Sequence, residues 1–337
     1  MSFEEYLRHI KMRQNMERAD AKAFLSLMLD DTSLTDETIA DALTALTKKT
    51  VTAEEICGFV DAMRERMVRV PYSGPAIDTC GTGGDQQGTF NISTAAAILL
   101  AAGNVNVAKH GNRAATGKCG SADVLEALGV PVDLSPDAAA QALSSHGFVF
   151  LFAPLYHPSL KRLSQIRRQL GFPTVFNLLG PLLNPAGVKR QIIGTFSLAN
   201  AELLAAVMAQ MNYDHAIVLT SQDGLDEASL SAPVNIFEIK QSIVVRKSLK
   251  ASDYRLKPAP LSSLAGDDAT RNASIITDVL QPAVDLSAPQ RVVVLNAGLG
   301  FYVSGQESSV ELGVERAKII LASGAAGAKL KEFQGSR

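Results

Sequence analysis

The chain has 337 residues, of which 47% are hydrophobic and 20% are charged, and its formal net charge is −2. This balance is typical of a globular protein with one large core and a smaller attached unit. Because backbone-driven nucleic-acid binding requires a concentrated positive face, a slightly acidic chain without a long basic run is not expected to have a nucleic-acid partner.

Residues 1–72 are predicted to form a small helical domain. Apolar residues recur there at helical spacing, and Thr52 with Glu55 makes a capping box, so a helix should start at this point. The expected buried positions are Ile39, Leu43 and Leu46 before the box, and Ile56, Phe59, Val60 and Met63 after it. The last helix is expected to end near Pro71, where the sequence YSGP reads as a linker.

Residues 73–337 are predicted to form an α/β domain with a mainly parallel sheet flanked by helices. Short apolar runs alternate with helical patterns, as expected for strands that are buried on both faces. The runs are AIDTC (76–80), VNVAK (105–109), FVFLF (148–152), QIIGTF (191–196), HAIVLT (215–220) and RVVVLN (291–296). VNIFEI (234–239) and SIVVRKSL (242–249) alternate more strictly and predict an antiparallel pair toward one edge. Residues 158–184 return to helix and turn and are expected to pack against the N-terminal helices.

The strongest local signal is a glycine-rich loop, DTCGTGGD (78–85), which follows the first predicted strand. Glycines allow the backbone to approach a ligand closely, and the loop leads to TFNIST (89–94) and a helix that Asn91, Ser93 or Thr94 would cap. The unpaired N–H groups of a helix N-terminus favour phosphate. The pattern is neither a Walker A motif nor GxGxxG, which argues against a P-loop NTPase or a dinucleotide enzyme.

A second polar loop, KHGNRAATGKCGSAD (109–123), follows the next predicted strand. Open α/β sheets bind ligands beyond the carboxyl ends of their strands, so this loop is placed to contribute to the same site. Lys109 can supply a point charge to a phosphate and Ser121 a hydroxyl at a helix start, whereas Lys118 is expected to be solvated. His110 alone is more often structural than catalytic.

An acidic pair, Asp226 and Glu227, follows the predicted strand HAIVLT. Adjacent carboxylates beyond a strand end can hold Mg²⁺, which takes few protein oxygens and keeps several waters. Such a pair is usually surface charge, and it gains weight here because a phosphate site is independently indicated.

The sequence also indicates the compartment. Cys57, Cys80 and Cys119 lie far apart without a CxxC pair, which favours reduced thiols. The N-terminus is charged from its fourth residue and lacks the apolar segment of a signal peptide. The longest strongly apolar run, 95–102, is far shorter than the roughly 20 residues that span a bilayer. A cytoplasmic protein without a membrane partner is expected.

Taken together, these motifs resemble those of the anthranilate phosphoribosyltransferases. The matching segments are GTGGDQQGTFNIST (81–94), VAKHGNRAATGKCGSADVLEALGV (107–130), PLYHPSLKRLSQIRRQLGFPTVFNLLGPLLNPA (154–186), DGLDE (223–227) and NAGLGFYVSG (296–305). The resemblance covers nearly the whole chain, and it implies transfer of a phosphoribosyl group from phosphoribosyl diphosphate to the amine of anthranilate in tryptophan biosynthesis. It also implies Mg²⁺ as cofactor and a homodimer formed through the N-terminal helices.

The resemblance assigns site residues position by position. The donor site would comprise Gly81, Gly84, Asp85, Thr89, Asn91, Ile92, Ser93, Thr94, Lys109, His110, Gly111, Asn112, Arg113, Ala114, Ala115, Thr116, Gly117 and Ser121. The metal site would comprise Ser93, Asp226 and Glu227. Anthranilate would be bound by Gly81, Asn112 and Arg167, with His110 and His157 nearby. Arg168 is an alternative to Arg167 on the same helix, and no general base is assigned.

The chain departs from the family pattern at three points. Thr116-Gly117 stands where many members have two serines, Cys119 stands where serine is common, and Lys48-Lys49-Thr50 replaces lysine–glycine–glutamate. The first two lie near the donor site and could alter donor affinity.

Two other functions compete with the transferase. One is a pyrimidine nucleoside phosphorylase of related fold, and the other is a non-catalytic paralogue that binds nucleic acid. The KHGNR block and the acidic pair argue against the first, and the slightly acidic net charge with the intact acidic pair argues against the second.

Overall fold

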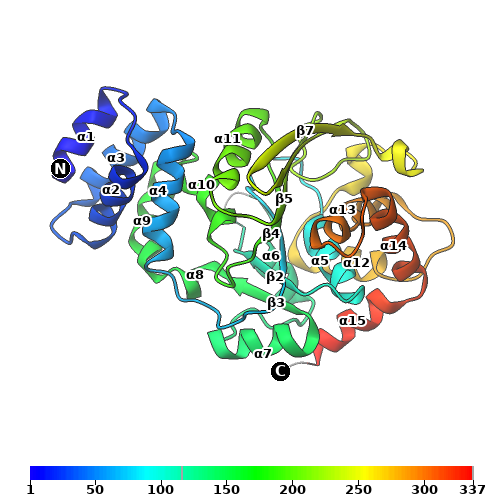
Figure 1. Cartoon of the computed structure of the whole chain (residues 1–337). Coiled ribbons are helices and arrows are strands. Elements are labelled where there is room, and N and C mark those ends of the chain that lie inside the picture. Colours follow the sequence, from blue (N-terminus) through cyan, green and yellow to red (C-terminus); the bar gives the residue numbers. More distant parts are fainter. Residues whose placement is uncertain (115–116, 336–337) are drawn as a thin grey trace.

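The computed structural model describes residues 1–114 and 117–335. A small helical unit, which contains the N-terminus, lies beside a larger unit in which helices surround one twisted sheet (Figure 1). This arrangement is the predicted fold class. In these described residues, no helix is both long and apolar enough to span a lipid bilayer.

Residues 1–70 fold into helices and connecting turns, as predicted. The helices are α1 (Phe3–Lys11), α2 (Arg18–Asp30), α3 (Asp36–Lys49) and α4 (Ala53–Arg64). The Thr52 side chain accepts a hydrogen bond from the Glu55 N–H, and the Glu55 side chain accepts one from the Thr52 N–H, so the predicted capping box is present. Every predicted apolar position of α3 and α4 is buried.

The predicted end of the fourth helix is wrong. α4 ends at Arg64 rather than near Pro71. The Val68 backbone N–H donates to the carbonyl of Tyr156 at 2.9 Å, in the larger unit. The chain therefore leaves the helix early because its amides bond to the α/β unit instead of to the preceding turn.

The segment 158–184 packs onto the N-terminal helices, as predicted. It contains η1 (Pro158–Leu160), α9 (Lys161–Leu170), α10 (Phe176–Leu179) and η2 (Gly180–Leu183), and follows α8 (Ala153–Tyr156). Leu163 and Ile166 of α9 share one hydrophobic core with α1–α4. Arg162 pairs with Asp36 at 2.8 Å and so ties α9 to the start of α3.

Seven strands form one sheet in the order β3-β2-β1-β4-β5-β6-β7. They are β1 (Ile77–Gly81), β2 (Val107–Gly111), β3 (Phe148–Phe152), β4 (Arg190–Gly194), β5 (His215–Ser221), β6 (Val234–Lys240) and β7 (Ile243–Leu249). The first five are parallel, whereas β6 and β7 are the predicted antiparallel pair at the edge. The carboxyl ends of β1, β2, β4 and β5 therefore meet at one edge of the sheet.

Both faces of the sheet are covered, which explains the continuous apolar runs. Ile217 and Leu219 of β5 join the core of one face, and Ala216 and Val218 join the core that includes the N-terminal helices. The remaining helices are α5 (Ile92–Ala102), α6 (Ser121–Ala127), α7 (Pro136–His146), α11 (Leu198–Ala209), α12 (Ala269–Val279), α13 (Ala288–Ser304), α14 (Val310–Ala322) and α15 (Ala325–Gln334), with short turns η3 (Ala251–Tyr254) and η4 (Leu261–Leu264).

One predicted strand is wrong. RVVVLN (291–296) lies inside α13, a helix of 17 residues that is buried along most of its length. Ser287 and Gln290 form a capping box ahead of it, and Pro289 occupies its first turn. Apolar residues continue to Val303, so the run belongs to a helix buried on all sides, and the valines' preference for strands is overridden by this packing.

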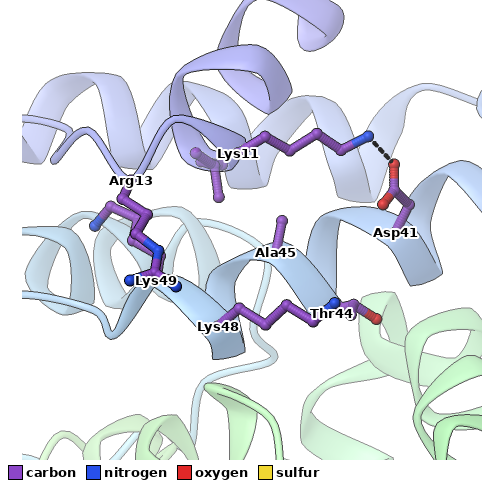
Figure 2. Close-up of a pocket in the computed structure, with 8 residues that line it drawn as sticks. Lys11, Arg13, Asp41, Thr44, Ala45, Lys48 and Lys49 are labelled. Atoms are coloured by element: carbon purple, nitrogen blue, oxygen red, sulfur yellow. Dashed lines mark ion pairs between the residues drawn. The ribbon is translucent and has the colours of Figure 1, made fainter.

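A cavity of about 220 Å³ lies between α1 and α3 in the helical unit (Figure 2). Its wall includes Lys11, Arg13, Lys48 and Lys49. Three of these cations belong to the last turns of α1 and α3, where positive charge complements the helix dipole. Their placement therefore has a structural explanation that does not involve a ligand.

We expect the ion pair of Lys49 and Glu55 to be important for folding. Both side chains are buried, with Nζ 2.7–2.8 Å from the two carboxylate oxygens, and Glu55 also accepts from the Met16 and Thr52 N–H groups. The Lys49→Met change would leave a buried carboxylate without its counter-charge and should cost roughly 3–5 kcal/mol in urea unfolding. Lys11→Met is the control, because it breaks an exposed pair with Asp41 (2.6 Å) worth less than about 1 kcal/mol. Equal losses in the two variants would contradict this view.

Candidate functional site

The two polar loops and the acidic pair lie at the carboxyl edge of the sheet. The first loop (residues 82–91) joins β1 to α5, the second (112–120) joins β2 to α6, and the acidic pair lies on the third (222–233), after β5. The Gly83 N–H donates to Asp226 Oδ2 at 3.2 Å, so the first and third loops are in direct contact. The structure thus brings together residues that are more than 140 positions apart.

The glycines of the first loop have two different structural roles. Gly83 and Gly84 have φ values of +66° and +86°, which are favourable only for glycine. Gly81 is required for space, because a Cβ there would lie 2.5 Å from Asp226 Oδ2. Gly194, at the end of β4, would place a Cβ 1.6 Å from the Asp226 carbonyl oxygen. The close approach of Asp226 to two strand ends therefore depends on glycine at both.

The N-terminus of α5 is bonded by a carboxylate from the third loop. Asn91, one of the three predicted cap residues, occupies the cap position, but its side chain makes no capping hydrogen bond. Instead, the Ser93 N–H donates to Glu227 Oε1 at 3.1 Å. The sequence places phosphate at this helix end, and in the structure Glu227 lies beside the same N–H groups, which favour negative charge.

Lys109 lies under the first loop, with its side chain buried. Its Nζ donates to the Thr79 carbonyl at 2.5 Å and to Ser93 Oγ at 3.3 Å. Its positive charge acts on Glu227 and lowers the pKa of that carboxyl relative to what burial alone would produce. The ammonium is therefore held between β1 and the start of α5, where its charge acts on Glu227.

Asp226, Glu227 and Asp85 lie close together here, and ionisation of Asp226 and Glu227 is disfavoured. Burial is the main cause that raises the pKa of Glu227 to about 7, and burial with the neighbouring charges of Glu227 and Asp85 holds the pKa of Asp226 well above its ordinary range. Asp226 and Asp85 also share a side-chain hydrogen bond. A cluster of carboxylates that repel one another is stabilised by a bound cation.

The donor set suits a magnesium ion that arrives with its ligand. In residues 1–114 and 117–335, no three His, Cys, Asp or Glu side chains are arranged to hold a metal by themselves. Mg²⁺ is commonly held by one or two carboxylates together with phosphate oxygens and waters. Oxygens of Asp226, Glu227 and Ser93 fit that requirement, whereas a site built for zinc would need more protein ligands.

The second loop is held by α6. Arg113 pairs with Glu126 at 2.6 Å and with Asp123 at 3.0 Å, and its guanidinium lies over the Phe152 ring. Asp123 also accepts from the Ala114 N–H at 3.0 Å. The Arg113 guanidinium is thus engaged with α6 in this structure. Asn112, Arg113, Ala114 and Gly117 are exposed and Gly111 and Ser121 are half-buried, whereas Ala115 and Thr116 lie outside the described residues.

Two buried histidines lie ring to ring beside the second loop. The centroids of His110 and His157 are 5.2 Å apart. Burial lowers the pKa of His110 to about 3 and that of His157 to about 4, so both rings are neutral at pH 7. In the described part of the chain His110 Nε2 has no hydrogen-bond partner, which leaves a polar atom able to contact a ligand.

Arg167 and Arg168 differ clearly in their surroundings. Arg167 is half-buried on α9, and burial lowers its pKa. Its Nη2 donates to Asn177 Oδ1 at 3.2 Å, and its guanidinium lies over the Phe176 ring. Among the described residues, no carboxylate pairs with Arg167. Arg168, by contrast with the half-buried Arg167, is exposed. A partly desolvated cation that holds only an amide retains donors for an acidic ligand group.

Sequence reasoning missed a buried polar network beneath the site. Asp78 on β1 is fully buried and accepts from the His110 N–H, from Asn184 Nδ2 at 2.9 Å and from Gln191 Nε2 at 3.2 Å. Burial raises its pKa to about 6 despite the nearby charge of Lys109. An aspartate inside an otherwise apolar strand was the available signal, because a buried carboxylate requires such partners.

Comparisons with known proteins agree with this geometry. The model of the glycosyl transferase family α/β domain matches residues 73–327, and that of its helical bundle domain matches residues 4–67. Anthranilate phosphoribosyltransferase of Chlorobium phaeovibrioides is 40% identical over 326 residues, covering 96% of this chain and 92% of that protein. The Thermus thermophilus enzyme of the same name has a similar structure, with a TM-score of 0.90, 35% identity and 98% of each chain covered. The Saccharomyces cerevisiae enzyme in complex with PRPP and Mg has a TM-score of 0.89 and 28% identity, with 99% of this chain and 97% of that chain covered.

Proposed function

The chain belongs to the anthranilate phosphoribosyltransferase family, and we propose that its reaction takes place between the three loops at the carboxyl edge of the sheet. The enzyme transfers the phosphoribosyl group of phosphoribosyl diphosphate to the amine of anthranilate, giving N-(5-phosphoribosyl)anthranilate and diphosphate, a step of tryptophan biosynthesis. The observation that carries the proposed location is the contact of Asp226 with the first loop and of Glu227 with Ser93 at the start of α5, whose hydroxyl also bonds the buried Lys109.

Displacement of diphosphate from the anomeric carbon develops positive charge on the sugar and negative charge on the leaving group. The main tasks are to stabilise the departing diphosphate and to align the acceptor amine. Three groups can stabilise the departing diphosphate. They are the N–H groups of the first loop, the N-terminus of α5 and the Lys109 ammonium. The donor residues named from the resemblance, from Gly81 to Ser121, belong to the first and second loops or to the strand ends and helix starts that the loops join.

Mg²⁺ would be held by oxygens of Asp226, Glu227 and Ser93 together with the diphosphate. When bound, the ion would neutralise the carboxylate cluster and the charge of the leaving group. Burial and the charges of Glu227 and Asp85 raise the pKa of Asp226, so metal binding should favour the ionised form of the Asp226 carboxyl. Binding of the donor and of the metal are therefore expected to depend on each other.

Arg167 is proposed to bind the carboxylate of anthranilate, because it is partly desolvated and retains free donors. The neutral rings of His110 and His157 can contact the uncharged aromatic ring of the acceptor without a charge penalty. An aromatic amine is already neutral at pH 7, so the reaction requires no strong base, and histidines with pKa values this low would not supply one.

Product analysis tests the proposed function. Incubation of the protein with anthranilate, phosphoribosyl diphosphate and Mg²⁺ should give N-(5-phosphoribosyl)anthranilate and equimolar diphosphate, identified by mass spectrometry. Phosphorolysis of a pyrimidine nucleoside in place of this product would instead identify a nucleoside phosphorylase. If the protein catalysed neither reaction and bound nucleic acid tightly, this result would identify a non-catalytic paralogue.

We expect Gly84→Ala to weaken binding of the donor much more than binding of the acceptor. Gly84 has a φ of +86°, and an alanine in this left-handed region is strained by roughly 1–2 kcal/mol, so the loop should relax away from the ligand. Calorimetry with the magnesium–donor complex should show affinity reduced about tenfold or more, with the acceptor KM little changed. Gly187→Ala is a matched control, because Gly187 has a φ of +62° in a turn outside the three loops. Normal donor affinity for Gly84→Ala would make this loop a structural turn only.

The remaining proposals concern assembly and location. The N-terminal helices expose residues of α1, α3 and α9 around a shared core, and we propose that they form the contact of a homodimer. We also propose that the enzyme acts in the cytoplasm, where free cysteines such as Cys57, Cys80 and Cys119 remain reduced. Light scattering of the purified protein tests the first proposal.

A further inference from the structure

The segment of residues 264–272, which runs from the end of η4 into the first turn of α12, lies against the first loop. Ala265 forms an antiparallel bridge with Thr89, and the Gly266 N–H donates to the Gly88 carbonyl at 2.8 Å. The two chain segments therefore pair as a short ribbon. None of the residues assigned to the donor or acceptor by resemblance belongs to the 264–272 segment.

Asn272, the first-turn residue of α12 that ends this segment, connects it to both donor loops. Its side chain is 2% exposed. Its Oδ1 accepts from the Asp267 N–H at 2.8 Å, and its Nδ2 donates to Asn91 Oδ1 at 3.0 Å. Asn91 in turn donates from Nδ2 to the carbonyl of Cys119, in the second loop, at 3.2 Å. The chain of amides thus runs from the 264–272 segment through the first loop to the second.

This chain of hydrogen bonds explains why Asn91 does not cap α5. Its Oδ1, which would accept a helix N–H, is taken by Asn272 and receives a further contact from Cys119 Sγ at 3.4 Å. Each amide can donate only from nitrogen and accept only at oxygen, so the orientation of Asn272 dictates that of Asn91. The orientation of Asn91 then decides whether the Cys119 carbonyl has a donor.

The close packing of the segment supports a fixed position. A Cβ on Gly266 would lie 2.7 Å from both Asn272 Oδ1 and the Phe90 nitrogen. An ion pair of Lys118 with Asp267, at 2.6 Å, also links the second loop to the segment, but both side chains are more than half exposed, so this pair contributes little. The buried amide contacts are the ones able to set the geometry.

We propose that the 264–272 segment is a third component of the donor site, and that Asn272 is a positioning residue that fixes the spacing of the first and second loops. The proposal rests on the proposed function, because both loops must contact one donor molecule. Asn272 acts through Asn91 and does not touch the substrate. A ligand held by two loops loses affinity when their separation is no longer fixed before binding.

The test is Asn272→Ala, which removes the amide without adding charge near an anionic donor. The expected result is a rise of about tenfold in the dissociation constant of the magnesium–donor complex, measured by calorimetry. The KM for anthranilate should change less than about twofold, because its proposed carboxylate contact, Arg167, lies on α9 outside both loops. Asn272→Ser, whose hydroxyl is too short to reach Asn91, should give the same split and serves if the alanine variant folds poorly.

Gln290→Ala is the matched control. Gln290 is also a buried amide, and it bonds the Ser287 N–H and the Val279 and Gln281 carbonyls, away from the donor loops. Its loss should lower the melting temperature while donor affinity is unchanged. Unchanged donor affinity in both Asn272 variants, or an equal loss in Gln290→Ala, would overturn the inference. Absence of donor binding by the unaltered protein would overturn the proposed function as well.

Discussion

Replacement of Asp226 and Glu227 together by Asn and Gln should reduce turnover by about two orders of magnitude or more. A bound metal contributes several kcal/mol of charge stabilisation to a departing diphosphate, and the double variant removes both carboxylates that would hold it. The measurement is kcat as a function of Mg²⁺ concentration. We expect the residual activity to require much more Mg²⁺ than the unaltered enzyme does.

The fold should survive this change. Burial raises the pKa of Glu227 from its ordinary value of 4.5 to about 7. Ionisation of this carboxyl therefore lowers the stability of the fold as the pH rises from 4.5 through 7. Neutral Asn and Gln avoid that cost, so the melting temperature at pH 7 and above should stay the same or rise. Asp223→Asn is a control from the same loop, since the Asp223 carboxylate accepts from the Ser229 and Ser231 hydroxyls, and the change keeps the backbone carbonyl that bonds Gln87 of the first loop. Unchanged activity of the double variant at limiting Mg²⁺ would remove the pair from the mechanism.

Arg167→Ala should raise the acceptor KM more than it lowers kcat. A guanidinium that binds the anthranilate carboxylate stabilises ground and transition states alike. A charged hydrogen-bonded pair in a closed site is worth roughly 1.5–3 kcal/mol, which corresponds to about a 10- to 150-fold change. The donor KM should hardly move, because the proposed donor contacts lie at the first and second loops and not on α9. Steady-state kinetics with each substrate varied in turn provides the measurement.

Arg168→Ala is the matched control, one residue further along α9. Arg168 is exposed, so its loss should be nearly silent. If Arg168→Ala carried the acceptor defect and Arg167→Ala did not, the assignment of the carboxylate contact would be wrong by one residue. If neither variant changed the acceptor KM, the carboxylate would be bound elsewhere, and Asn112 would become the better candidate.

Much of the fold could be predicted from the sequence because its signals are local. The capping box of Thr52 and Glu55 and the strict alternation of residues 234–249 each specify one element from neighbouring residues. The prediction of a strand at residues 291–296 (RVVVLN) was wrong because a short apolar run fits a buried strand and a buried helix equally well. The capping box at Ser287 and Gln290 was the signal that could have decided it.

The site was predictable as a set of loops but not as a set of contacts. Parallel strands bring their carboxyl ends to one edge, so the first and third loops could be placed together. No local pattern indicates that Glu227 bonds the start of α5, or that Asn272 bonds Asn91 across 181 positions. Such contacts depend on tertiary packing, as does the space that Gly194 leaves for Asp226.

The central claim is that this chain transfers a phosphoribosyl group to anthranilate. The donor's diphosphate would be held at the carboxyl edge of the sheet during the transfer. Anthranilate fluorescence tests it most directly, because the signal is lost when the amine is substituted. We predict that fluorescence decays only when protein, phosphoribosyl diphosphate and Mg²⁺ are all present, and that the double variant of Asp226 and Glu227 abolishes most of the decay. Constant fluorescence with folded protein and all three components would contradict the account.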